Sequence, residues 1–198
     1  MLRFNFLNIR NQVAYLPVIS WAFYDFANTI FAMNMLSLYF VLWVTEDKSG
    51  TQLTFSLFLS GSMLAAAITA PFYGAITDMA GKRVFLLGTG VILCVVSTSL
   101  IGTLGGVTAG LIFFAIANYS YQSSNIFYDA LLRAVSNPRN RGRISGFGVS
   151  LGYVGTITGI LMVSPFVEEW GRQAAFIPTA FLFLLFSLPC LLFVKDEK

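Results

Sequence analysis

The sequence has 198 residues, of which 57% are hydrophobic and only 11% are charged. Soluble domains carry about 25% charged residues, whereas the mean hydropathy of this chain is +0.76. A soluble core of this length cannot hide so much apolar surface, so the composition indicates a protein embedded in lipid. The net charge of +3 arises in short turns between apolar runs, a pattern that does not indicate a nucleic-acid partner.

Six apolar runs are each long enough to cross a bilayer as a helix, which needs roughly 20 residues. They cover residues 17–44, 53–76, 84–104, 107–132, 144–167 and 173–194. Little sequence lies between them, so we expect one all-α transmembrane domain over residues 1–198. The first run is too long for a cleavable signal, and we expect it to remain as a helix.

The basic residues predict how the helices are oriented. Lys and Arg total 12. The ten on one side are Arg3, Arg10, Lys82, Arg83, Arg133, Arg139, Arg141, Arg143, Lys195 and Lys198, and the two on the other are Lys48 and Arg172. The positive-inside rule therefore predicts that both termini are cytoplasmic. Nothing in the sequence marks an organelle, so we expect the cell membrane or an inner membrane.

The first apolar run carries a polar stripe. Trp21, Asp25, Asn28 and Thr29 are spaced i, i+4, i+7 and i+8, so they share one helix face. Asp25 is expected about 13 Å deep, and an ionisable group at that depth should face the bundle interior or a water-filled cavity. It is a candidate for carrying a coupling proton or binding a substrate ammonium. The alternative is a structural partner for a polar group on the fourth or fifth helix.

A second polar stripe lies in the fourth run, where Asn118, Gln122, Asn125 and Asp129 are spaced i, i+4, i+7 and i+11. Counting from the start of this run predicts Asn118 about 15 Å deep, level with Asp25. Asn118, Gln122 and Asn125 are candidates for lining a cavity opposite Asp25, together with Asn28. The alternative is that the amides hydrogen-bond between helices and hold them together.

Charged residues at the cytoplasmic turns are candidates for a gate. They are Asp78, Lys82, Arg83, Asp129 and Arg133. Such charges can form a salt-bridge latch that holds one of two rigid-body states. The alternative for Asp78, Lys82 and Arg83 is a solvated turn that sets the topology. Arg133, Arg139, Arg141 and Arg143 are also interpreted as topology determinants and contacts for anionic lipid.

Glycine spacing and an internal repeat add to this picture. The fifth run contains Gly148-xxx-Gly152 and Gly155-xxx-Gly159, a spacing that favours close helix packing. The second run ends Ala-Pro-Phe at 70–72, followed by an acid, a glycine and a base, and the fifth ends Ser-Pro-Phe at 164–166, followed by two acids, a glycine and a base. Since these two helices would leave the membrane on opposite sides, we expect two inverted triplets of helices, as in many transporters.

Gly74-xxx-Asp78-xx-Gly81-Lys82-Arg83, after the second run, resembles the signature turn between helices 2 and 3 of the major facilitator superfamily. Residues 20–28 (SWAFYDFAN), 125–132 (NIFYDALL) and 141–155 (RGRISGFGVSLGYVG) resemble the vacuole-effluxer-like branch of that superfamily more narrowly. The resemblance implies a transporter fold, with export of small solutes as the associated activity. It also implies that the first helix of each triplet lines the central path.

Members of this superfamily have twelve helices in two halves, and the sequence resembles only the N-terminal half. The two halves run parallel, so two copies with cytoplasmic termini would reproduce the arrangement. We therefore expect a secondary active transporter for a small polar solute, working by alternating access as a homodimer or with another six-helix half.

The other function classes are weaker. The chain has no histidine, and only Asp25 and Asp129 lie within apolar runs, which is too sparse a set for an enzyme. No Gly-xxxx-Gly-Lys-Ser/Thr motif is present, so ATP is not expected to bind at a P-loop, and we expect no cofactor or metal. The main alternative is a non-transporting partner or sensor subunit derived from half a transporter.

Overall fold

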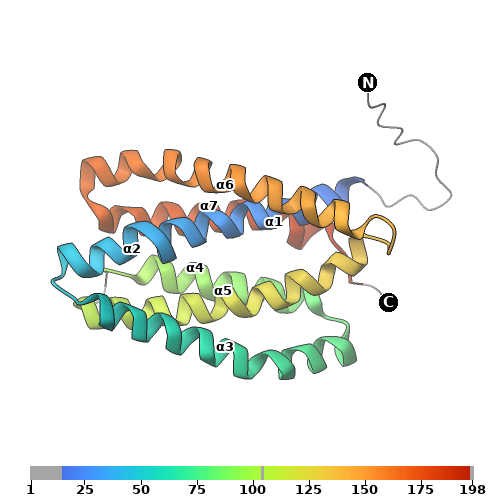
Figure 1. Ribbon diagram of the computed structural model, residues 1–198, viewed down its shortest axis with the longest axis horizontal. Coiled ribbons are helices and arrows are strands. Elements are labelled where there is room, and N and C mark those ends of the chain that lie inside the picture. Colours follow the sequence, from blue (N-terminus) through green and yellow to red (C-terminus); the bar gives the residue numbers. More distant parts are fainter. Residues whose placement is uncertain (1–14, 104, 197–198) are drawn as a thin grey trace.

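The computed structural model describes residues 15–103 and 105–196, without the side chains of Asp78 and Ala80. Its helices in chain order are α1 (Tyr15–Phe31), η1 (Ala32–Leu38), α2 (Tyr39–Leu42), η2 (Trp43–Asp47), α3 (Gln52–Ala80), α4 (Arg83–Leu100), α5 (Val107–Val135), α6 (Arg141–Trp170), η3 (Arg172–Ala175) and α7 (Phe176–Phe193). None of the described residues forms a strand. The predicted all-α class is therefore confirmed (Figure 1).

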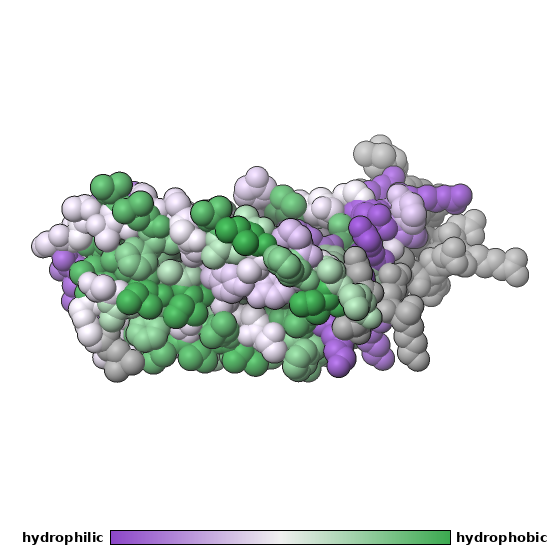
Figure 2. Space-filling model, turned by 90° about the horizontal axis from the view of Figure 1, so that it is seen from below, coloured by the Kyte–Doolittle hydropathy of each residue, from purple (hydrophilic) through white to green (hydrophobic). Residues whose placement is uncertain are grey.

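Within residues 15–103 and 105–196, five helical stretches are long and apolar enough to cross a membrane: Tyr15–Asp47, Gln52–Thr77, Arg83–Leu100, Arg141–Trp170 and Arg172–Phe193. Between the third and fourth of these stretches runs α5, whose 29 residues span about 43 Å and carry the second polar stripe. Figure 2 shows the surface that results, a hydrophobic band with hydrophilic side chains gathered mainly at one end. This is the surface of a helical bundle whose sides face lipid.

The first crossing is not a uniform α-helix. It continues without a break from Tyr15 to Asp47, but Ala32–Leu38 and Trp43–Asp47 are π-helical. Leu38 has φ −129° and ψ −87°, outside the helical region. Asn34 is fully buried within the first π-helical segment and donates from Nδ2 to Oγ1 of Thr179 in α7, at 3.0 Å. π-Helical turns are rare and frequently occur at functional sites.

The helices pack in the pattern of an inverted repeat. α1 packs mainly on α6 and α7, α5 packs mainly on α3 and α4, and α4 packs on α7. The first triplet is α1, α3 and α4, and the second is α5, α6 and α7. If each helix is exchanged for its counterpart (α1 for α5, α3 for α6, α4 for α7), the same list of packed pairs results. The two triplets begin in opposite directions, because the first crossing, α3 and α4 precede α5, and α5 therefore runs antiparallel to α1 (Figure 1).

Both ends of the described chain lie at the same end of the bundle, since α1 begins there and α7 finishes there (Figure 1). The α3–α4 and α5–α6 turns lie at that end too. It therefore carries Lys82, Arg83, Arg133, Arg139, Arg141, Arg143 and Lys195, while Lys48 and Arg172 lie at the opposite end. Arg3, Arg10 and Lys198 fall outside the described residues.

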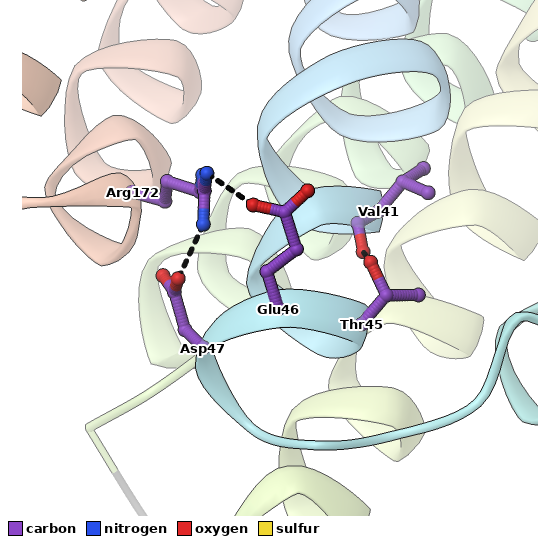
Figure 3. Close-up of polar contacts among 5 residues, drawn as sticks. All are labelled: Val41, Thr45, Glu46, Asp47 and Arg172. Carbon is purple, nitrogen blue, oxygen red and sulfur yellow. Dashed lines mark hydrogen bonds and ion pairs between the residues drawn. The ribbon is translucent and has the colours of Figure 1, made fainter.

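At the end that carries Lys48, an ion-pair clamp joins the first crossing to η3. Arg172 contacts Oδ1 of Asp47 through Nη1 and Oε2 of Glu46 through Nη2, each at 2.5 Å (Figure 3). The neighbouring Gln173 donates from Nε2 to the Gly102 carbonyl at 2.8 Å, which ties in the turn between α4 and α5. Three turns from both triplets are thus held together.

The contact between α1 and α6 depends on the glycines of α6. A methyl group placed on Gly155 would lie 2.4 Å from the Phe26 carbonyl oxygen and 2.6 Å from Oγ1 of Thr29. The hydroxyl of Thr29 donates to the Gly152 carbonyl at 2.6 Å. Only helices whose side chains are this small can approach so closely, which in lipid is a main source of association.

We predict that Gly155→Ala destabilises the protein by about 1–3 kcal/mol, because the new methyl group must push α6 away from the α1 backbone. The measurement is the melting temperature of the protein in detergent. Gly146→Ala is the matched control, since Gly146 is exposed on the same helix and a methyl group there would meet nothing within 4 Å. Equal melting temperatures for the two variants would contradict the close contact.

Candidate functional site

Asp25 lies at the seam between α1 and α6 and is half-buried. Its carboxyl group rests on the glycine face of α6: a methyl group placed on Gly148 would lie 3.4 Å from Oδ2 of Asp25, and one on Gly152 would lie 3.6 Å from Cγ. Among the described residues, none forms a hydrogen bond or an ion pair with this carboxylate. The glycines thus leave room for a charged group within a membrane-crossing helix without neutralising it.

The start of α1 meets the end of α5 through aromatic side chains. The Trp21 ring stacks on Tyr128 with centroids 4.6 Å apart, and its Nε1 donates to the Tyr128 carbonyl at 3.2 Å. Tyr24 also packs on Tyr128, at 4.6 Å. Asp129 follows Tyr128 on α5, just as Asp25 follows Tyr24 on α1, and Asp129 is exposed. Two carboxylates therefore flank this aromatic contact.

These ring contacts set the register between α1 and α5 and correct the expected depths. Tyr24 pairs with Tyr128 and Phe31 pairs with Tyr121, so Asn118 lies beyond Phe31, about 13 Å further along the axis than Asp25. The prediction that Asn118 and Asp25 lie level is wrong. That prediction counted the depth of each residue from the start of its own helix, and the two helices start at opposite ends of the bundle. Because α5 is about 43 Å long, well over the 30 Å of the hydrocarbon core, the two counts do not refer to the same level.

Asn118 faces α3 instead. It is fully buried and donates from Nδ2 to Oγ of Ser62 at 2.8 Å. The same α3–α5 contact holds the hydroxyls of Tyr73 and Tyr119, 2.8 Å apart, with Tyr119 donating to Thr69 at 3.2 Å. Of the two interpretations left open by the sequence, this contact fits the one in which the Asn118 amide joins helices.

Asn28 and Asn125 lie in the seam between α1 and α5. Asn28 is one turn from both Tyr24 and Phe31, and Asn125 is one turn from both Tyr121 and Tyr128, so the register brings the two amides to the same level. The Oδ1 atom of each is buried and accepts no hydrogen bond in the described structure. Buried acceptors are normally satisfied, so this seam has unused capacity for a hydrogen-bond donor. Gln122, on the same stripe of α5, is half-buried.

Sequence reasoning placed Trp21 on the first polar stripe but assigned no role to Tyr24, Tyr121 and Tyr128, which also frame this seam. Tyr24 is fully buried, and its hydroxyl, like that of Tyr128, has no hydrogen-bond partner in the described structure. Spacing carries a signal for them: Trp21 and Tyr24 share one face of α1, and Tyr121 and Tyr128, seven residues apart, share one face of α5. The stripes of aromatic and polar residues coincide on both helices.

The candidate gate residues are gathered at the end of the bundle where α1 begins. Gly81 ends α3 with φ +58°, a conformation that favours glycine, and the chain turns there into Lys82, which is exposed, and Arg83, which is half-buried. The side chain of Asp78 lies outside the described structure. On α5, Asp129 and Arg133 are exposed one turn apart. The structure brings these groups to one end of the bundle.

Comparison with known proteins gives the family. The model of the Major Facilitator Superfamily matches residues 26–198. An uncharacterized MFS-type transporter of Bacillus subtilis (strain 168), YxiO, is 26% identical over 200 residues, which cover 90% of this chain and 46% of the relative. An uncharacterized protein of Aquifex aeolicus (strain VF5) is 27% identical over 181 residues, 91% of this chain and 46% of the relative. No solved structure gives a significant match.

The chain therefore spans about half the length of the curated relatives that it matches. Its six-helix bundle is half of a major facilitator fold. The family and the apolar helices make it a multi-pass integral membrane protein and point to a membrane transporter rather than an enzyme. By the match of the family model over residues 26–198, the chain belongs to the Major Facilitator Superfamily.

Proposed function

We propose that this chain forms one half of a secondary active transporter that moves a small polar solute by alternating access. The observation that carries the proposal is the half-buried Asp25, inside a membrane-crossing helix and without a bonded partner among the described residues. An uncompensated carboxylate at such a position is costly and is functional by default. A role as a proton carrier, or as a ligand for a cationic group of the solute, would account for the energetic cost of placing the Asp25 carboxylate there.

The residues that would receive the solute or the coupling proton are Asp25, Asn28, Gln122 and Asn125. The free Oδ1 atoms of Asn28 and Asn125 support this assignment, because a polar solute or water would supply the missing donors. Asn118 is assigned to helix packing on the strength of its bond to Ser62. Resemblance to the vacuole-effluxer-like branch favours export of small solutes as the direction and class of transport.

The end that carries most of the basic residues is proposed to be cytoplasmic, following the positive-inside rule. Asp78, Lys82, Arg83, Asp129 and Arg133 would then form a latch with a second half at this end. The clamp of Arg172 on Glu46 and Asp47 ties the opposite end together within the half. Such internal ties support movement of the bundle as a rigid body, which alternating access requires.

A second six-helix half is part of the proposal. It could be a second copy of this chain, a separately encoded partner or more of the same polypeptide. The length of the relatives, about twice the match, supports two halves, and small exposed residues on α3, such as Gly61 and Ala65, would let another bundle approach. The alternative is a non-transporting partner or sensor subunit, for which an intramembrane acid is not needed.

We predict that Asp25→Asn reduces solute-coupled proton movement at least about 10-fold, because the amide has no exchangeable charge. The measurement uses vesicles that contain the protein with its second half and a trapped pH-sensitive dye, to which candidate small polar solutes are added. Folding of the variant is checked by its melting temperature in detergent.

Glu168→Gln is the matched control, since Glu168 is an exposed carboxylate outside the polar stripes, and it should leave the proton movement unchanged. Unaltered proton movement in Asp25→Asn would remove the coupling role. Absence of any solute response in the unmodified protein would favour the partner-subunit alternative.

A further inference from the structure

The turn between α5 and α6 carries a concentrated positive charge without any acid. Residues 130–145 contain four arginines, and Asp and Glu are absent from them. Arg133, Arg139 and Arg143 are exposed and Arg141 is half-buried. Within the described structure none of the four forms an ion pair; Arg141 donates from Nε to Oγ of Ser136 at 3.3 Å. The charge of this turn is therefore not neutralised by ion pairs within the described part of the chain.

The turn is held in shape by its own side chains. Oδ1 of Asn137 accepts hydrogen bonds from the backbone N–H groups of Arg139 and Asn140, each at 3.1 Å. Oδ1 of Asn140 accepts one in return from the Asn137 N–H, at 2.7 Å. Reciprocal bonds of this kind restrict the backbone of the turn, so the exposed side chains of Arg139 and Arg143 extend from a backbone of fixed conformation.

Arg143 continues into an apolar stripe on α6. Phe147, Val154 and Leu161 follow it at i+4, i+11 and i+18, on one helix face. They are 46%, 52% and 66% exposed, respectively. The glycines that contact α1 occupy the opposite face of α6. From Arg143 to Leu161 the stripe runs about 27 Å, so a cationic group stands at one end of a long, uncovered apolar surface.

We propose that this surface binds one acidic phospholipid, with the phosphate held by Arg139 and Arg143 and an acyl chain lying along Phe147, Val154 and Leu161. Guanidinium groups suit this ligand because they donate two parallel hydrogen bonds to phosphate oxygens. Zwitterionic lipid has a cationic choline beside its phosphate and gains less from a cluster of unpaired arginines. The proposal does not depend on the transport activity.

The test is native mass spectrometry of the detergent-purified protein titrated with phosphatidylglycerol or with phosphatidylcholine of the same acyl chains. We expect one phosphatidylglycerol to be retained by the unmodified protein and phosphatidylcholine to be lost. Arg139→Gln with Arg143→Gln should weaken retention of phosphatidylglycerol roughly 10-fold or more. Arg139→Lys with Arg143→Lys, which keeps the charge but not the paired hydrogen bonds, should be intermediate.

Two controls separate a lipid site from general attraction of anions. Lys195→Gln removes an exposed charge from the same end of the bundle and should have little effect. Phe147→Ala should weaken retention, whereas Tyr153→Ala, an exposed aromatic residue on another face of α6, should not. Equal retention of the two lipids, an equal effect of Lys195→Gln, or displacement by inorganic phosphate with no effect of Phe147→Ala would each overturn the proposal.

Discussion

The close approach of α6 to α1 is the contact on which the candidate site depends. Because α6 presents glycines at positions 148, 152, 155 and 159, its backbone lies against the α1 backbone, and Thr29 can donate directly to the Gly152 carbonyl at 2.6 Å. The same glycines leave space for the carboxyl group of Asp25. A larger side chain at Gly148 or Gly152 would meet that group, so the contact that joins the helices also keeps the acid available within the membrane.

The packing of the remaining helices follows the same inverted repeat. α3 holds α5 as α6 holds α1, while α4 and α7 pack together behind them. The two polar stripes consequently lie on neighbouring first helices of the two triplets. The hydrogen bonds between α3 and α5 use Asn118, Ser62 and a pair of tyrosines where α1 and α6 use glycines. The two equivalent contacts are thus chemically different, and only one of them leaves a carboxylate without a bonded partner among the described residues.

Much of the fold could be predicted from sequence, because hydropathy and the positions of charged turns dictate which segments cross a bilayer. The glycine spacing in α6 also predicted a close contact. Relative depth could not be predicted: Asp25 and Asn118 were each counted from one end, and only the pairing of Phe31 with Tyr121 sets the register. The π-helical Ala32–Leu38 contains no proline or glycine that could have signalled it in the sequence. The bond of Asn118 to Ser62 could not be predicted either, because the sequence does not show which helix lies against that face of α5.

The central proposal is that this bundle works together with a second six-helix half. The most direct measurement is the native mass of the protein extracted gently from its own membrane. The account predicts a particle that contains two six-helix units, either two copies of this 21.8-kDa chain or this half joined to a different one. A lone six-helix particle of 21.8 kDa would contradict it.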